Sequence, residues 1–204
     1  MRLCCKKINM NKNFNIVITG TGGQGLITLL KIISEAALLE GYDIKTSELH
    51  GLSQRGGSVE VHIRFGKKIY SPLVAKNKAD LVIGLEMQEI LRAINFANSK
   101  TVFLINQHII PIPLEKPVPQ EQIIKKLKMQ SKNILLVPAS QICQQEFGKS
   151  VTAGIYLLSL ASFKGIIPLK PQSMLSAIKQ IIPKKYFEQN KKTFELAEEN
   201  GKKK

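Results

Sequence analysis

A glycine-rich turn between an apolar strand and an apolar helix is the feature that most constrains the fold of this chain. Residues 15–19 are mostly apolar or β-branched, which predicts a short buried strand. The turn Gly20-Thr21-Gly22-Gly23-Gln24-Gly25 follows, and apolar residues then recur at helical spacing until Gly41 ends the helix. A strand, a tight turn and a helix in this order predict the opening unit of an α/β domain.

The same turn raises the question of a ligand, because Gly20, Gly22 and Gly25 fit the pattern Gly-x-Gly-x-x-Gly, with Gly23 as a further glycine. The N-terminus of the following helix would offer free N–H groups and partial positive charge to a phosphate. A dinucleotide site also requires an acid about 20 residues further on, and Glu48 could fill that role. Since tight strand–helix packing requires glycines even without a ligand, a packing corner and a phosphate site both stay open.

The remaining pattern predicts a three-layer α/β/α Rossmann-like domain whose sheet is mixed. Residues 59–65 alternate between apolar and polar, and the turn Gly66-Lys67-Lys68 leads into residues 69–74, so we expect an antiparallel hairpin there. Further strands are expected near residues 43–47, 80–85, 101–105 and 134–137. Helices are expected near residues 88–97, 120–129, 140–147, 151–163, 171–181 and 184–199. The last helix is polar, and we expect it to fray or to rest on a partner.

Length and composition favour one domain. A chain of 204 residues with 44% hydrophobic residues can bury one sizeable core. We expect residues 1–13 to be a disordered extension or a misassigned start, residues 14–200 to form the domain, and residues 201–204 to be a basic tail. The longest apolar stretch is about half of the roughly 20 residues that cross a bilayer, and the N-terminus lacks the apolar core of a signal peptide. We therefore expect a cytoplasmic protein.

The net charge of +15 suggests nucleic acid or an acidic protein as a partner. Most of the 30 basic residues are lysines spread along the chain, and the arginines are Arg2, Arg55, Arg64 and Arg92. Aromatic residues do not interleave with the basic runs, as they do in proteins that bind single strands. We interpret most of the excess as solvated surface. A nucleic-acid-binding module stays a secondary hypothesis, and an acidic electron carrier would also suit this charge.

Residues suited to metal binding or catalysis do not form a recognisable pattern. The cysteines and histidines are scattered, without CxxC or metal-ligand spacing: Cys4, Cys5, Cys143, His50, His62 and His108. A Walker lysine, a Gly-x-Ser-x-Gly elbow and a Gly-Asp-Gly element for thiamine-bound magnesium are all missing from the sequence. We predict that this chain has no catalytic residue and binds no metal or cofactor on its own.

A second unusual segment is the polar, glycine-containing loop expected from Glu48 to Gly57. It follows a strand end, where open α/β sheets usually place their sites. One interpretation is purely structural, a hairpin entry held by hydrogen bonds. The alternative is an interface or active-site wall formed with the glycine turn, and its candidate residues are Gly20, Gly22, Gly23, Gln24, Gly25, Glu48, His50, Ser53, Gln54, Arg55, Gly56 and Gly57.

Three motifs together resemble one family. They are the glycine turn, the segment Tyr70-Ser71-Pro72-Leu73 before Ala79-Asp80-Leu81-Val82, and the segment Ser47-Glu48-Leu49-His50-Gly51-Leu52-Ser53-Gln54-Arg55-Gly56-Gly57-Ser58-Val59. This set is similar to the gamma-type subunit of the 2-oxoacid:ferredoxin oxidoreductases, so residues 14–200 would form a single pyruvate/ketoisovalerate oxidoreductase gamma-type domain. The Ser-Gln-Arg-Gly-Gly loop most resembles the indolepyruvate branch. Gly148-Lys149 and Gly154 depart from the Gly-Asn step and further Asn that are usual there.

The resemblance implies a division of labour between two subunits. A large partner would carry thiamine diphosphate, magnesium and iron–sulfur clusters. It would decarboxylate an arylpyruvate such as indolepyruvate, release CO2, reduce ferredoxin and transfer the acyl group to coenzyme A. This chain would bind no cofactor, would be inactive alone, and would complete the complex. A free-standing dinucleotide-binding oxidoreductase that uses the Gly20–Gly25 turn is the alternative function.

Overall fold

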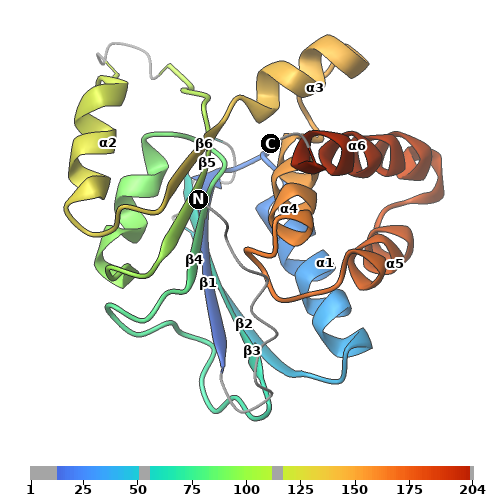
Figure 1. The fold of residues 1–204 in the computed structure, drawn as a ribbon, viewed down its shortest axis with the longest axis horizontal. Coiled ribbons are helices and arrows are strands. Elements are labelled where there is room, and N and C mark those ends of the chain that lie inside the picture. Colours follow the sequence, from blue (N-terminus) through green and yellow to red (C-terminus); the bar gives the residue numbers. More distant parts are fainter. Residues whose placement is uncertain (1–12, 51–55, 112–116, 203–204) are drawn as a thin grey trace.

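The structure, a computed structural model, describes residues 13–50, 56–111 and 117–202 and shows one mixed sheet between two layers of helices (Figure 1). The sheet has the strand order β2-β3-β1-β4-β5-β6. Its strands are β1 (Phe14–Thr21), β2 (Asp43–His50), β3 (Ser58–Gly66), β4 (Leu81–Gly84), β5 (Val102–Asn106) and β6 (Ile134–Val137). The predicted α/β/α class with a mixed sheet is confirmed.

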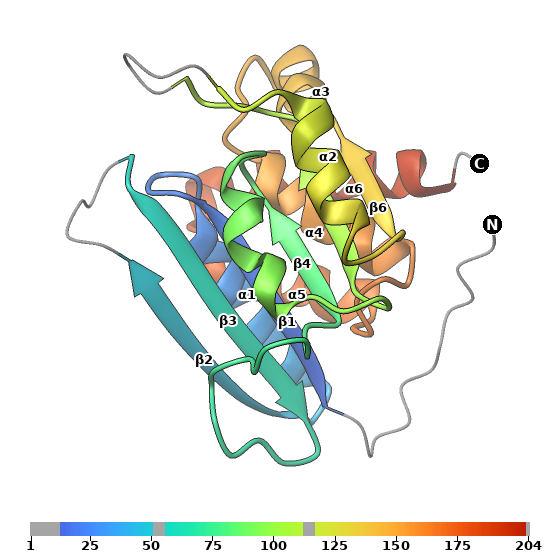
Figure 2. The ribbon, with the colours of Figure 1, turned by 90° about the vertical axis from the view of Figure 1, so that its left-hand side faces the viewer.

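The antiparallel part of the sheet lies at one edge (Figure 2). β3 pairs antiparallel with β1 on one side and with β2 on the other, whereas β1, β4, β5 and β6 are parallel. The antiparallel hairpin is therefore β2–β3, and the prediction that residues 69–74 pair with residues 59–65 is wrong. Both edges of β3 are already occupied, and side chains satisfy the amides of the irregular segment instead: Ile69 donates to Asp43 Oδ2 at 2.7 Å and Val74 donates to His62 Nδ1 at 3.0 Å.

The helices divide between the two faces of the sheet (Figure 1). One face carries α1 (Leu26–Leu39), α4 (Ala153–Phe163), α5 (Pro171–Ile181) and α6 (Lys184–Lys202), and the other carries the 3-10 helix η1 (Glu89–Phe96) and α2 (Gln120–Lys128). α3 (Ala139–Phe147) follows β6 at the carboxyl end of the sheet. None of the helices within the described ranges is long and apolar enough to cross a bilayer.

Successive side chains of a strand point to opposite faces of the sheet, so an apolar strand requires cover on both faces. Ile16 and Ile18 of β1 pack in the core under α1, while Val17 between them packs in the core under η1. Strands that are buried on both faces read as continuous apolar runs, as β1 and β4 do. α4 is apolar all round because it lies between the other helices of its layer and the sheet.

The polar helix α6 packs on its own chain. Phe194 and Ala197 are buried, and the rings of Phe194 and Phe163 lie 4.8 Å apart between centroids. Asn200 Nδ2 donates to the Tyr156 hydroxyl at 3.0 Å. The expectation that this helix frays is therefore wrong, because a narrow apolar stripe every third or fourth residue is enough to hold it against α4. The alternative, that it rests on a partner, stays a prediction.

Candidate functional site

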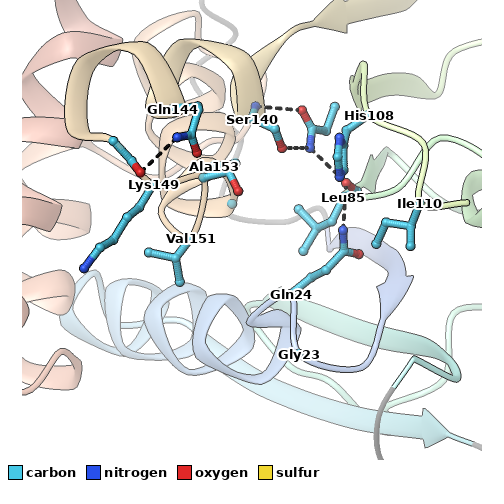
Figure 3. A pocket seen from close by; sticks show the side chains of 14 residues that line it. Gly23, Gln24, Leu85, His108, Ile110, Ser140, Gln144, Lys149, Val151 and Ala153 are labelled. Atoms are coloured by element: carbon cyan, nitrogen blue, oxygen red, sulfur yellow. Dashed lines mark hydrogen bonds between the residues drawn. The ribbon is translucent and has the colours of Figure 1, made fainter.

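The carboxyl ends of the central strands open into a cavity of about 520 Å³ between the glycine turn and the turn that precedes α4 (Figure 3). Open α/β sheets place their ligand sites at this edge. The lining combines amide, hydroxyl and other polar side chains with glycines and apolar side chains: Gly23, Gln24, Leu85, Asn106, His108, Ile110, Ser140, Gln144, Gly148, Lys149, Ser150, Val151, Ala153 and Gly154.

Gln24 closes the glycine turn upon itself. Its Oε1 accepts the N–H of Thr21 at 2.8 Å. Its Nε2 donates to the carbonyl of Leu85 at 3.3 Å, as Figure 3 shows. A Cβ at Gly20 would lie 2.6 Å from that Oε1 and 3.2 Å from the Cβ of Leu85. The first glycine of the motif therefore leaves room for the close approach of a side chain of this same chain.

The last glycine of the motif starts α1. Gly25 has φ 80°, a left-handed conformation that favours glycine, and its carbonyl accepts the N–H of Leu29 at 3.1 Å. Within the described part of the chain, no side chain caps the first turn of α1. Gly23 is exposed and lines the cavity beside this helix start. The turn is thus closely packed at Gly20 and exposed at Gly23.

The two glycine motifs of the sequence meet at one backbone hydrogen bond. Gly22 N donates to the carbonyl of Gly57 at 2.9 Å, so the end of the second motif, Gly56-Gly57, lies beside the glycine turn. Ser53, Gln54 and Arg55 lie outside the described residues. The structure therefore brings the two predicted segments together through their backbones.

Glu48 and His50 lie in a strand and not in the predicted loop. Both belong to β2, opposite Val61 and Val59 of β3, because the strand continues three residues beyond the expected end at position 47. Glu48 is exposed on this edge strand. β3 separates β2 from β1, so Glu48 is not at the end of the strand next to the glycine turn, where a ribose-binding acid would have to be.

Asn106 and Ser140 complete the polar floor of the cavity, and sequence reasoning missed both. Asn106, which is 2% exposed, donates from Nδ2 to the Leu85 carbonyl at 3.0 Å and to Ser140 Oγ at 2.7 Å. Ser140 N donates back to Asn106 Oδ1 at 3.1 Å. Asn106 ends β5, so a polar residue at the carboxyl end of a parallel strand was the available signal.

The opposite side of the cavity is the turn from Gly148 to Val151. Gly148 ends α3 with φ 68°, and its carbonyl accepts a hydrogen bond from Gln144 Nε2 at 2.9 Å (Figure 3). Lys149, Ser150 and Val151 are exposed. The residue after this turn is held by α6, because Thr193 donates from Oγ1 to Thr152 Oγ1 at 3.1 Å.

Gly154, in the first turn of α4, has a packing role. A Cβ at this position would lie 3.1 Å from Leu29 Cδ1 on α1, which is closer than ordinary van der Waals contact. The small residue lets the starts of the two helices approach each other, and the cavity forms where they meet.

Two groups buried near this turn, the Cys143 thiol and the Tyr156 phenol, have raised pKa values. Burial raises the pKa of the Cys143 thiol above 9.0, and a hydrogen bond with Thr152 offsets part of that shift. Burial likewise raises the pKa of Tyr156. A thiol with a raised pKa stays protonated at neutral pH and is a poor nucleophile.

The polar groups that line the cavity are suited to binding. Among the described residues that line the cavity, His108 and Lys149 are the ionisable ones, and neither faces a carboxylate across it. No group of three or more histidine, cysteine or acidic side chains suited to a metal ion occurs within the described ranges. The site offers amide, hydroxyl and ammonium groups, which orient a ligand or a neighbouring subunit.

Comparison with known proteins decides the family. Residues 15–199 match the model of the pyruvate ferredoxin/flavodoxin oxidoreductase family. The chain belongs to this family. It is 33% identical over 192 residues to the indolepyruvate oxidoreductase subunit IorB of Thermococcus kodakarensis, an alignment that covers 91% of this chain and 94% of the relative. It is 28% identical over 173 residues to the common gamma subunit of the pyruvate/ketoisovalerate oxidoreductases of Pyrococcus abyssi, covering 85% and 89%. The resemblance inferred from the sequence motifs is confirmed.

Two solved structures share this fold, one along almost its whole chain and the other in about a third of a longer chain. The pyruvate oxidoreductase subunit PORC of Thermotoga maritima superposes with a TM-score of 0.69 at 22% identity, covering 93% of this chain and 97% of that one. The 2-oxoglutarate:ferredoxin oxidoreductase of Magnetococcus marinus superposes with a TM-score of 0.66 at 16% identity, covering 94% of this chain but 31% of that one. The same fold thus occurs both as a separate chain and within a larger one.

Proposed function

We propose that this chain is the small, cofactor-free subunit of a thiamine-dependent 2-oxoacid:ferredoxin oxidoreductase that acts on arylpyruvates such as indolepyruvate. A large partner subunit would hold thiamine diphosphate, magnesium and iron–sulfur clusters. The complex would decarboxylate the 2-oxoacid oxidatively, release CO2, transfer the acyl group to coenzyme A and pass the electrons to ferredoxin. The chain alone would be inactive.

The observation that carries the proposal is the end-to-end similarity to IorB-type subunits. The alignment with the Thermococcus kodakarensis relative leaves few residues unmatched in either chain. The 33% identity to that subunit exceeds the 28% identity to the common gamma subunit of Pyrococcus abyssi, which favours the indolepyruvate branch.

The site supports a role as interface or active-site wall. The glycine turn and the turn from Gly148 to Val151 line one open cavity at the carboxyl edge of the sheet, and Gly57 bonds to the back of the glycine turn through Gly22 N. Its lining offers hydrogen-bond donors and one ammonium group but no pair of groups placed for acid–base catalysis. Such a surface can close the active site of a neighbouring subunit or border the path of coenzyme A.

The fold argues against the free-standing dinucleotide-binding alternative. In that fold the strand after the first helix lies next to the first strand and brings its acid to the ribose. Here β3 occupies that position, and Glu48 lies on the far edge strand. Calorimetry of the isolated chain with common dinucleotides should show no heat of binding, and micromolar binding of any of them would restore the alternative.

Co-expression with the candidate large subunit tests the main proposal. We expect the complex to reduce ferredoxin or viologen with coenzyme A present, and to use indolepyruvate and phenylpyruvate with a higher kcat/KM than pyruvate. The matched control is the large subunit prepared alone under the same conditions. If the large subunit is equally active without this chain, the proposal fails, and a preference for pyruvate would remove only the arylpyruvate assignment.

A further inference from the structure

An apolar groove lies beside the cavity, where the starts of α1 and α4 meet the link between α5 and α6. Its volume is about 550 Å³. It shares Gly23, Gln24, Lys149, Val151 and Gly154 with the cavity already described. Its apolar surface is formed by Leu29, Val151, Ile155, Ile182, Pro183 and Tyr186, and we call it the α4–α6 groove.

Two large apolar or aromatic side chains border this groove without being buried by it. Val151 is 72% exposed and Tyr186 is 50% exposed. Pro183 beside them is exposed as well. A pocket for a small ligand usually encloses its apolar groups, whereas side chains that stand half exposed around a groove are covered when another protein surface docks. The exposure pattern therefore favours a macromolecular occupant.

Lysines line the same groove or lie close to its lining residues. Lys149 lines it, Lys184 and Lys185 lie between Pro183 and Tyr186, and Lys192 lines a shallower cavity of about 280 Å³ that also includes Lys149. Lys185 Nζ lies 4.7 Å from the centroid of the Tyr186 ring.

Carboxylates do not neutralise these lysines. The ion pairs that α6 makes within the described residues use Lys191 and Lys202 instead. Glu188 is the carboxylate among the described residues lining the shallow cavity, so positive charge dominates this surface. Unpaired ammonium groups around an apolar centre select a partner with acidic flanks, through both encounter rate and register.

We propose that the α4–α6 groove docks a segment of the large subunit in which an apolar or aromatic side chain is flanked by carboxylates. The inference rests on the proposed function for the existence of that subunit. The apolar anchor would cover Val151 and Tyr186, and the carboxylates would pair with the surrounding lysines. Interfaces concentrate their binding energy in such central anchors, with charged groups at the rim.

Substitutions at exposed positions test this without disturbing the core. Affinity between the subunits is measured by titrating labelled chain with purified large subunit at several salt concentrations. The groove variants are Tyr186→Ala, Val151→Asp, Val151→Lys and the pair Lys184→Glu with Lys185→Glu. The matched control is the pair Lys125→Glu with Lys126→Glu, which reverses two exposed lysines of α2 on the opposite face of the sheet.

We expect Tyr186→Ala and the Lys184/Lys185 reversal each to weaken binding about tenfold, and the α2 reversal to change it by less than about twofold. Both Val151 variants remove the apolar contact, but Val151→Asp should weaken binding more than Val151→Lys because the approaching segment is acidic. The difference between the two should shrink at high salt.

Three outcomes would overturn the inference. One is unchanged affinity in all groove variants while the unsubstituted chain binds. Another is an equal loss in the α2 control, which would mean a general charge effect. The third is unchanged subunit affinity with a raised KM for coenzyme A in Tyr186→Ala, which would make the groove a small-molecule site. Failure of the unsubstituted chain to bind any candidate large subunit would remove the proposed function itself, together with this inference.

Discussion

Two glycine-containing turns face each other across the cavity, and they are built in opposite ways. In the turn from Gly20 to Gly25, the Gln24 side chain folds back on the backbone and bonds to Thr21 N and the Leu85 carbonyl. In the turn from Gly148 to Val151, three consecutive side chains after the glycine are exposed. The polar side chain of the first turn forms hydrogen bonds within this chain, whereas the side chains of the second turn are exposed to solvent.

The difference separates scaffold from recognition surface. The first turn ties β1, β4 and α1 together, and Asn106 extends the same hydrogen-bond network to β5 and α3 through the Leu85 carbonyl. The second turn is held at its two ends, by the hydrogen bond from Gln144 to the Gly148 carbonyl and by that between Thr193 and Thr152. We therefore expect substitutions in the first turn to change the stability of the chain, and substitutions in the second to change what the chain binds.

The largest expected effect on stability is that of Gly20→Ala. The added methyl group would lie 2.6 Å from Gln24 Oε1 and 3.3 Å from Leu26 Cδ1, so Gln24 must leave its two hydrogen bonds. Overpacking of this kind typically costs about 2 kcal/mol. The free energy of unfolding from urea denaturation of the purified chain provides the measurement.

A double-mutant cycle gives this first prediction its control. If the cost arises from the contact between Gly20 and Gln24, then Gly20→Ala should cost about 1 kcal/mol less in a Gln24→Ala background than in the unsubstituted chain. Additive effects of the two substitutions would show that the methyl group acts elsewhere, for example against Leu85. Contact with Gln24 would then not explain the need for a small residue at position 20.

Most of the fold could be predicted from local patterns. The parallel strands and the helices follow from apolar runs and 3.6-residue periodicity, and residues 134–137 form β6 where expected. The hairpin partner could not be predicted this way, because residues 43–50 and residues 69–74 are both short β-compatible segments. The choice depends on which free edge of β3 each can reach, and that is a tertiary property.

The second prediction compares one left-handed glycine from each turn, Gly25 and Gly148. Gly25 (φ 80°) and Gly148 (φ 68°) both have open space where a Cβ would lie, so replacing either by alanine tests backbone strain alone. We expect each to lose about 1 kcal/mol, with asparagine costing less than alanine at both positions. Thermal denaturation is the measurement. A loss at Gly25 several times that at Gly148 would mean that the first turn is stiffer than its backbone conformation explains.

The location of the candidate site could be predicted from the sequence, but most of its side chains could not. The glycine motif indicated the location, because positive-φ glycines and a following helix are local features. Asn106, Ser140 and Lys149 come from three different segments, and only the order of the strands brings them to one edge of the sheet. Glu48 shows the converse, since its spacing from the glycines fits a dinucleotide site while β3 keeps it away.

A smaller effect is expected at alkaline pH and concerns the second turn. The pKa of Cys143 is raised in the folded chain, chiefly by burial, so folding favours the protonated thiol. The resulting stability is present in full below the unfolded pKa, near 9.0, and is lost as pH rises through the folded value. We expect the Tm to fall above pH 9, and Cys143→Ala to show a shallower fall than the unsubstituted chain. Identical slopes in the two proteins would assign the alkaline loss to other groups, such as Tyr156.

The smallest expected change in stability is that of Lys149→Ala. Lys149 is exposed, lines the cavity, the α4–α6 groove and the shallower cavity beside it, and forms no ion pair within the described ranges. Its removal should change the free energy of unfolding by less than about 0.5 kcal/mol. Because it is the one ammonium group shared by all three hollows, the same substitution should lower the kcat/KM of the assembled complex several-fold, whereas Lys128→Ala on α2 should not. A Lys149 variant that unfolds more easily but supports full activity would reverse the roles assigned to the two turns, because the second turn would then be scaffold.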